Sequence, residues 1–281
     1  MQEISLDELP EYSEWPERLI KNKTKYRKTS KEVVREFNLE KWNETLGLLI
    51  KSEKSSLTEI EDEIYPLNSE SLFYEVGKLW KTTHGYGVKR HLDLYKDTLL
   101  RHINGSKALV ELGAGYGSKA FALKQMEEIE DIPLVIAELT ENGRNASVLL
   151  AKKLNIDVKV GACDFRLLSI DKDLVPPDSI IFTSYAMHYV PKFSKGIIDY
   201  FLKLKPKIVI HFEPLFEILE GDSIHSLLCQ EYINQNDYTT NLYSRILSAQ
   251  DEGKIKVLEL NKKVIGQNPL LPISVIVWKP L

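Results

Sequence analysis

The pattern of hydrophobic and polar positions changes near residue 105. After Gly105, short apolar runs alternate with segments whose apolar residues recur every three or four positions. This alternation predicts an α/β fold, doubly wound, in which a mainly parallel sheet is covered by helices on both faces. The predicted strands are 108–110, 134–137, 158–160, 180–182, 208–210, 257–260 and 273–278, and the predicted helices between them are 118–129, 142–154 and 193–204.

The first third of the chain has a different texture, in which charged and aromatic residues mix at helical spacing. Two apolar faces stand out, one formed by Phe37, Leu39, Trp42, Leu46, Leu48 and Leu49, the other by Leu72, Phe73, Val76, Leu79 and Trp80. We therefore expect residues 1–84 to form a helical region and residues 85–281 to form the α/β domain. A long segment at about 215–253 is expected to be a helical insert in that domain.

Ligands of parallel α/β sheets bind beyond the carboxyl ends of the strands, near the switch in strand order. The first such end carries three glycines, Gly113, Gly115 and Gly117, directly before a predicted helix. A dinucleotide fingerprint needs its last glycine or alanine at position 118, where this chain has Ser118. The loop also has a carboxylate, Glu111, at its entrance, whereas a pyrophosphate favours an uncluttered helix N-terminus. These two departures argue against a dinucleotide.

Acidic residues at successive strand ends suit a cationic cofactor that carries an α-amino group and a nucleoside. Glu111 can favour an ammonium group, and Glu138 can accept hydrogen bonds from two ribose hydroxyls. Asp164 can accept from an adenine amino group, and Phe165 beside it can pack on the ring. The alternative is a plain tight turn at 113–117 with solvated acids around it.

The stretch Val110-Glu111-Leu112-Gly113-Ala114-Gly115-Tyr116-Gly117 resembles the first motif of class I S-adenosylmethionine-dependent methyltransferases, and Glu138 and Asp164 match the ribose and adenine acids of that family. The resemblance covers about residues 85–281. It implies a Rossmann-like, seven-stranded sheet with the final strand inserted antiparallel, residues 1–84 as an N-terminal lid and acceptor region, and S-adenosyl-L-methionine as cofactor. The cofactor-binding residues that we expect are Glu111, Gly113, Ala114, Gly115, Gly117, Glu138, Asp164, Phe165, Ser184 and Tyr185.

Three residues are candidates for a catalytic role, either removing a proton from an acceptor or orienting it. His188 follows the fourth strand, and histidine titrates near neutral pH; the alternative is a structural hydrogen bond at a helix start. Glu213 lies at the end of the fifth strand, where it either orients an acceptor or caps the loop before Pro214. His84 lies in a Gly-rich interruption at 82–87, whose alternative is a plain turn between helices.

The acceptor itself is less well defined by the sequence. The strand-four exit lacks the Asn-Pro-Pro-Tyr motif of family members that methylate adenine or glutamine, and it is similar to the exit of small-molecule members. Amide, hydroxyl and phenol groups dominate 230–243, which suits either a polyhydroxylated or peptidic ligand or a solvated loop. We expect methylation of an oxygen or nitrogen on a sugar, a natural product or a side chain of a ribosomally made peptide.

Charge and composition limit the classes of partner that we expect. The net charge is −4 and the pI is about 6.0, so a nucleic-acid partner is not expected. We expect the basic run 21–31 to be a solvent-exposed face. A nucleic-acid methyltransferase and a non-catalytic cofactor-binding interaction protein remain the alternatives. No metal site is expected, and the oligomeric state is open, with a homodimer among the options. The chain lacks a secretory signal and any run of about 18 apolar residues, which predicts a cytoplasmic protein without a membrane partner.

Overall fold

The computed structural model describes residues 1–21, 29–219, 221 and 223–281. The strands are β1 (Gln2–Ile4), β2 (Glu70–Glu75), β3 (Lys78–Thr83), β4 (Leu109–Leu112), β5 (Leu134–Ala137), β6 (Val158–Gly161), β7 (Cys163–Asp164), β8 (Ser169–Ile170), β9 (Ile180–Ser184), β10 (Ile208–Glu213), β11 (Ile255–Gly266) and β12 (Ile273–Pro280). The helices are α1 (Leu9–Tyr12), α2 (Trp15–Lys21), α3 (Ser30–Arg35), α4 (Trp42–Lys51), α5 (Leu57–Ile64), α6 (His84–Leu100), α7 (Ser118–Lys124), α8 (Glu141–Leu154), α9 (Ile197–Lys203), α10 (Ile224–Gln235) and α11 (Leu242–Asp251), with a π-helix η1 (Glu36–Lys41) and the 3-10 helices η2 (Met187–Tyr189) and η3 (Phe216–Ile218).

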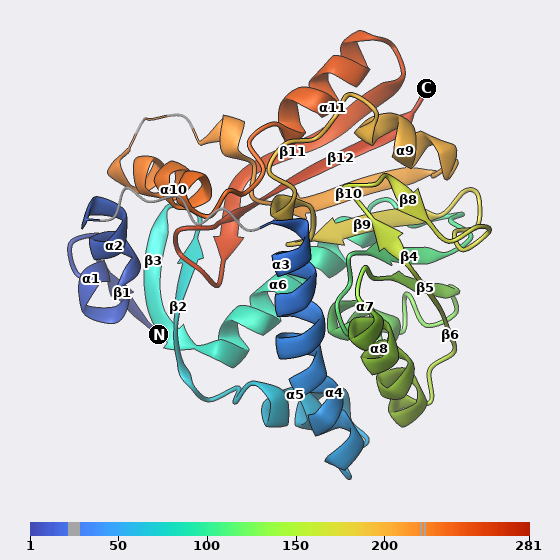
Figure 1. Cartoon of the computed structure of the whole chain (residues 1–281), viewed down its shortest axis with the longest axis horizontal. Helices are drawn as coiled ribbons and strands as arrows, with labels where there is room; N and C mark the ends of the chain where they lie inside the picture. The colour runs from blue at the N-terminus through green and yellow to red at the C-terminus, as the bar shows by residue number, and fades with distance from the viewer. Residues whose placement is uncertain (22–28, 220, 222) are drawn as a thin grey trace.

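A large mixed sheet runs through the molecule in the order β1-β3-β2-β11-β12-β10-β9-β4-β5-β6, with ten strands among the described residues (Figure 1). Strands β7 and β8 pair with each other in a separate antiparallel ribbon. Strands β6, β5, β4, β9 and β10 are parallel, whereas β12 is antiparallel to both of its neighbours, β10 and β11. The α/β class and the antiparallel insertion of the last strand are therefore confirmed. The expected number of seven strands is wrong for the whole sheet, because β1, β2 and β3 extend it beyond β11.

Helices cover both faces of this sheet. Successive strand residues point to opposite sides, and the apolar residues on each side pack against a different set of helices. On one face, α4 to α8 pack in the same apolar cluster as Leu109 and Ile210. On the other face, α9 and α11 cluster with Val110, Val209 and Trp278 (Figure 1). The expectation of a doubly wound arrangement is confirmed by these two clusters.

A β-hairpin replaces one of the two helical faces expected in the first third. Strands β2 and β3 pair in register from Glu70–Thr83 to Glu75–Lys78. Val76 and Gly77 join them, with φ values of 43° and 88°, and positive φ at both central residues is the mark of a type I′ turn. The helical interpretation of 72–80 was wrong because it counted Val76 with the buried face, whereas Val76 lies in the turn and is 72% exposed.

The hairpin also changes the setting of the segment 82–87, which was expected to separate two helices. It is instead a strand-to-helix junction, in which the Thr83 side chain caps α6 by accepting from the N–H of Tyr86. Two helix bounds differ too. Helix α7 ends at Lys124 rather than at residue 129, and α9 begins at Ile197 rather than at 193.

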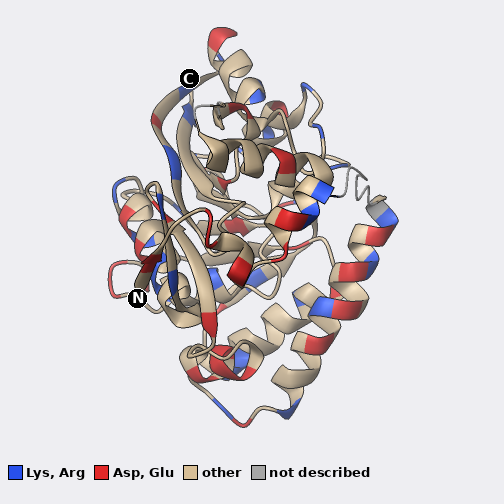
Figure 2. Cartoon of the chain, turned by 90° about the vertical axis from the view of Figure 1, so that its left-hand side faces the viewer, with Lys and Arg blue, Asp and Glu red and all other residues tan. Residues whose placement is uncertain are grey.

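The segment 29–51 forms a nearly continuous helical arm made of α3, η1 and α4. Acidic and basic residues are intermixed along it and over the neighbouring elements in Figure 2. The arm is tied to α8 by two hydrogen bonds, from the Asn142 N–H to Asn38 Oδ1 (2.9 Å) and from Asn142 Nδ2 to the Asn38 carbonyl (2.7 Å). Most of the basic run 21–31 lies outside the described residues.

The segment between β10 and β11 contains η3, α10 and α11. Helix α10 packs with α1 and α2 against the β1–β3 end of the sheet, through Leu9, Leu19, Tyr74 and Ile233. Within the described part of the chain, no helix is both long and apolar enough to span a membrane.

Candidate functional site

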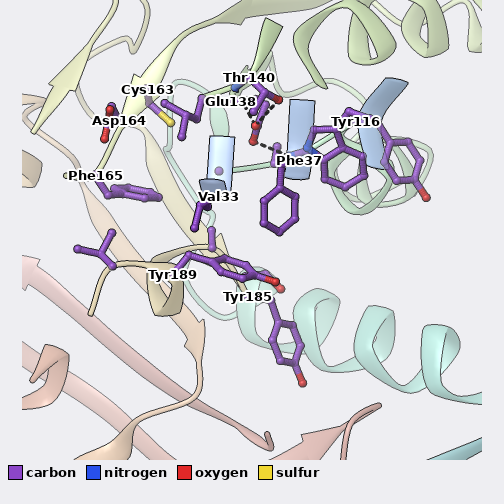
Figure 3. Close-up of a pocket in the computed structure, with 18 of the residues that line it drawn as sticks. Val33, Phe37, Tyr116, Glu138, Thr140, Cys163, Asp164, Phe165, Tyr185 and Tyr189 are labelled. Atoms are coloured by element: carbon purple, nitrogen blue, oxygen red, sulfur yellow. Dashed lines mark hydrogen bonds between the residues drawn. The ribbon is translucent and has the colours of Figure 1, made fainter. Parts of the chain in front are cut away.

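A cavity of about 280 Å³ opens beyond the carboxyl ends of β4, β5 and β9. Strand β4 lies between β5 and β9, so the chain order reverses direction here, which is the usual ligand position in such sheets. Figure 3 shows Glu138 and Asp164 along one side of the cavity, with Phe37, Tyr189 and Tyr185 along the other. Eight of the ten cofactor-binding residues expected from the sequence line it: Gly113, Ala114, Gly115, Glu138, Asp164, Phe165, Ser184 and Tyr185.

The glycine loop after β4 depends on backbone conformations that other residues rarely adopt. Gly113, Gly115 and Gly117 have φ values of 74°, 60° and 81°. A Cβ at residue 113 would lie 2.4 Å from the Cβ of Ala186, so the backbone of the loop packs directly against the methyl group of Ala186. Gly117 caps α7 and does not line the cavity.

Glu138, at the end of β5, organises this side of the cavity. Its Oε2 accepts from the N–H of Gly115 at 2.9 Å, and its Oε1 accepts from the N–H (2.9 Å) and the hydroxyl (2.8 Å) of Thr140. The side chain is 6% exposed. Because each carboxylate oxygen has two lone pairs, these three bonds leave one free lone pair, on Oε2, for a ligand hydroxyl group.

Asp164 and Phe165 follow β6 on the far side of Glu138 (Figure 3). Asp164 Oδ1 accepts from the N–H groups of Arg166 and Leu167, which fixes the side chain. Oδ2 takes no part in these two bonds. The Phe165 ring packs against the loop, 3.1 Å from where a Cβ on Gly113 would lie. Asp164 and Phe165 thus contribute one carboxylate and one aromatic ring to the cavity lining.

Glu111 takes a position different from that of the other expected cofactor residues. Its side chain is fully buried and does not line the cavity. One oxygen accepts from the Ala120 N–H at 3.2 Å, and the other lies 3.5 Å from Lys119 Nζ. Burial raises the pKa of this carboxyl, against the opposing effect of Lys119. Its contacts here are with the first turn of α7.

The exit of β9 supplies the part of the wall that adjoins the glycine loop. The Ser184 hydroxyl is 2.7 Å from the Tyr95 hydroxyl. Tyr185 has a left-handed backbone (φ 50°), and its hydroxyl donates to the carbonyl of Leu271 at 3.3 Å. A non-glycine residue held at positive φ is strained, and such residues cluster at functional sites.

Helical-arm residues complete the cavity, and sequence reasoning did not assign them to it. Val33, Phe37 and Trp42 all line the cavity. The Phe37 ring meets Tyr189 edge-on, with centroids 4.8 Å apart. Phe37 and Trp42 were recognised only as an apolar helical face, which does not reveal what that face covers.

Two of the three candidate catalytic residues lie beneath the cavity and not on its lining. His188 and Glu213 are both almost fully buried, with His188 Nδ1 3.6 Å from Glu213 Oε2. Glu213 Oε1 accepts from the N–H groups of Ala186 (3.0 Å) and Met187 (3.1 Å). Burial would raise the pKa of Glu213, but His188 and these two N–H groups outweigh it and hold that pKa below its ordinary value.

The third candidate, His84, lines a second cavity of about 500 Å³. Its Nδ1 accepts from Gln267 Nε2 at 3.1 Å, and burial lowers its pKa. The second cavity lies between α5, α6 and the start of α7, and it shares Tyr116, Ser118, Lys119 and Tyr185 with the first. The two cavities are therefore neighbours with a common wall.

Two further expectations concern the polar segment between β10 and β11 and a possible metal site. None of the described residues in 215–253 lines either cavity. Tyr232 and Tyr238 of that segment pack instead against Trp15 and His188, respectively. The described residues hold no cluster of three or more His, Cys, Asp or Glu side chains arranged to bind a metal ion.

Comparison with known proteins gives distant structural similarities. No family model matches this chain, and no curated protein does. Among solved structures, PigF with SAH is 20% identical over 68% of this chain and 56% of its own, with a TM-score of 0.45. OxaC in complex with SAH and oxaline is 14% identical over 68% and 47%, with a TM-score of 0.48. The pyocyanin biosynthetic protein PhzM is 17% identical over 67% and 55%, with a TM-score of 0.46.

This chain thus spans about half the length of each of these three proteins.

Proposed function

We propose that this protein is an S-adenosylmethionine-dependent methyltransferase that acts on an oxygen or nitrogen of a medium-sized acceptor. The observation that carries the proposal is the convergence of eight sequence-predicted cofactor residues, from four strand ends, on one cavity. When bound, S-adenosylmethionine supplies an electrophilic methyl group. The protein's own contribution is to bind, orient and enclose the reactants.

The residues on the cavity wall fit such a cofactor. Gly113 and Gly115 let a ligand approach the backbone closely. Glu138 offers the free lone pair of its Oε2 at the end of β5, where a ribose hydroxyl would be held. Asp164 and Phe165 would hold the adenine, with one carboxylate oxygen for its amino group and one ring for its face. The fit rests on the donor and acceptor types present on each side of the cavity (Figure 3).

We assign the N-terminal region, residues 1–84, to enclosure and acceptor binding. The helical arm places Val33, Phe37 and Trp42 over the first cavity, which supports a lid role. Residues of α5 and the following loop, among them Leu57 and Tyr65, line the second cavity, which supports an acceptor role. A sugar, a natural product or a side chain of a ribosomally made peptide is the acceptor class that we propose.

His188 and Glu213 are proposed as positioning residues. Glu213 accepts from two consecutive N–H groups just after Tyr185, and His188 lies against its other oxygen. Together they stabilise the strained exit of β9 that forms the cavity wall. His84 is proposed as a residue of the acceptor cavity, where its Nδ1 lone pair is already used by Gln267.

Calorimetry with S-adenosylmethionine and S-adenosylhomocysteine tests the proposal. Both compounds should bind the full chain, and Glu138→Gln should weaken binding at least tenfold, because a charged hydrogen-bond acceptor is worth about 1.5–3 kcal/mol. Glu141→Gln is the matched control, since Glu141 is exposed in the first turn of α8 and does not line the cavity. Absence of binding by the unmodified chain would refute the proposal. Binding without methyl transfer to any acceptor would favour the non-catalytic alternative.

A further inference from the structure

His91 is a buried histidine that the proposed cofactor site does not use. It lies on α6 and is 6% exposed. Its Nδ1 is 2.8 Å from the carbonyl oxygen of Gly87. A carbonyl only accepts, so Nδ1 carries the hydrogen, and in a neutral imidazole the lone pair is then on Nε2. Nε2 has no hydrogen-bond partner.

An unpartnered buried acceptor is destabilising, and native structures contain few of them. The His91 ring is surrounded by Phe73, Tyr95 and Tyr185, with ring centroids 5.8, 6.0 and 5.8 Å away. Burial lowers the pKa of His91 to about 4, so the ring is neutral near pH 7. A neutral imidazole with a free Nε2 is suited to a ligand that donates a hydrogen.

The His91 ring lines the second cavity, which has the composition of an acceptor site. Tyrosine rings and aliphatic side chains form much of the lining: Leu57, Tyr65, Leu67, Val88, Leu92, Tyr95, Tyr116 and Tyr185. A volume of about 500 Å³ falls in the range of small-molecule sites. Because four lining residues are shared with the first cavity, a ligand here would adjoin the glycine loop.

His84 lines the same cavity but differs from His91 in one respect. Its Nδ1 already accepts from Gln267, so that atom is satisfied within the protein. Nε2 of His91 exposes less than 1 Å² in this state, so a ligand meets it only after a neighbouring ring moves. Tyr95 and Tyr185 are the two neighbouring rings that also line the cavity.

We infer that the second cavity binds an aromatic acceptor carrying a hydroxyl group, and that Nε2 of His91 accepts a hydrogen bond from that hydroxyl. The inference rests on the proposed function and names the class of acceptor for it. A methylated oxygen has no hydrogen to donate, so the product loses this hydrogen bond. His91 would thus favour substrate over product at the same site.

A pair of probes that differ in one methyl group tests this. We use 2-naphthol and 2-methoxynaphthalene, titrated calorimetrically into the full chain saturated with S-adenosylhomocysteine. The unmodified chain should bind 2-naphthol at least tenfold more tightly, which corresponds to about 1.4 kcal/mol. His91→Phe should remove that preference while retaining S-adenosylhomocysteine binding. His102→Phe is the matched control and should keep the preference, because His102 lies outside both cavities and pairs with Glu259.

Nuclear magnetic resonance of the unmodified chain gives a readout that does not depend on the variant folding. The ¹⁵N shifts of His91 should report a protonated Nδ1 and a bare Nε2, and 2-naphthol should move the Nε2 resonance toward that of a hydrogen-bonded nitrogen. 2-Methoxynaphthalene should not do so.

Several outcomes would overturn the inference. They are equal affinity for the two probes, an unchanged preference in His91→Phe, an Nε2 resonance that 2-naphthol does not shift, and displacement of S-adenosylhomocysteine by 2-naphthol. If a buried water is the only partner of Nε2, 2-naphthol will leave the Nε2 resonance unshifted. If the chain binds S-adenosylhomocysteine but fails these tests, only the inference fails; if it does not bind S-adenosylhomocysteine, the proposed function fails.

Discussion

The indole of Trp42 packs against Gly115 so closely that a Cβ at residue 115 would lie 2.6 Å from its Cζ2 atom. Trp42 begins α4, and Gly115 is the middle glycine of the loop after β4. The same indole would meet a Cβ at Gly143 at 3.1 Å. One aromatic side chain of the helical arm therefore seats on two glycines of the α/β domain, directly beside Glu138.

Trp42→Ala should weaken S-adenosylhomocysteine binding by about tenfold, mainly through faster dissociation. The substitution removes a large ring that covers the cavity, and a tenfold change corresponds to about 1.4 kcal/mol. Stopped-flow fluorescence would give both rate constants. Trp15→Ala serves as control, because Trp15 packs on Tyr232 away from the cavity. A dissociation rate for Trp42→Ala equal to that of Trp15→Ala would contradict the lid role.

Gly113→Ala should destabilise the protein by at least about 2 kcal/mol. The residue has φ 74°, which costs about 1–3 kcal/mol for a non-glycine residue, and the added Cβ would lie 2.4 Å from that of Ala186. Urea unfolding measures the change. Gly47→Ala is the contrasting variant. Gly47 lies within α4 with nothing within 4 Å of its Cβ position, so alanine should raise the free energy of unfolding by up to about 1 kcal/mol. Equal effects at the two positions would rule out this account of the loop.

Val76→Asn should stabilise the protein by about 1 kcal/mol. Val76 has φ 43° in the turn between β2 and β3, where a β-branched residue is strained and asparagine is favoured. Val148→Asn tests the same exchange at an exposed position of α8, where both residues have similar helix propensity and a change within about 0.5 kcal/mol is expected. Thermal unfolding of both variants decides the matter, and a destabilised Val76→Asn would argue against the type I′ turn.

Acid should destabilise the protein through His211. Its Nε2 accepts from the Trp278 indole N–H at 3.1 Å, and burial lowers its pKa to about 4, against a small opposing effect of Glu213. Unfolded histidine has a pKa of about 6.5, so below that pH the unfolded chain binds a proton that the folded chain excludes. The contribution is fully present above pH 6.5 and is lost as the pH falls toward 4.

From pH 7 to pH 5 this histidine accounts for a loss of about 2 kcal/mol in the free energy of unfolding. His211→Gln keeps an acceptor for Trp278 but cannot titrate, so its loss over the same range should be smaller by about that amount. Denaturant unfolding at the two pH values compares the chains. The same loss in both would show that His211 does not contribute.

Much of the α/β domain follows from local sequence pattern. Apolar runs such as 134–137 and 180–182 are strands in the structure because a buried parallel strand needs apolar residues on both faces. The residues after these runs converge because parallel strands end at one edge, and this brings Glu138 and Asp164 to the same cavity as Gly113. These placements need only strand direction and order.

The hairpin at 70–83 shows the limit of local pattern. Apolar residues at 72, 73, 76, 79 and 80 fit a helical period as well as they fit two strands. Pairing with β11 favours the strands, since the sheet edge offers hydrogen-bond partners that a periodicity count does not include. The same pairing lengthens the sheet from the expected seven strands to ten.

The sequence by itself determined the glycine loop, the acids beside it and the strand ends that carry them, because each depends on neighbours a few residues away. Only the tertiary structure decided that Trp42 covers Gly115, that Glu213 supports the β9 exit, and that Nε2 of His91 is left without a partner. The physical reason is that burial and contact between segments distant in the chain depend on how the elements pack, and periodicity does not record what lies on the other side of an apolar face.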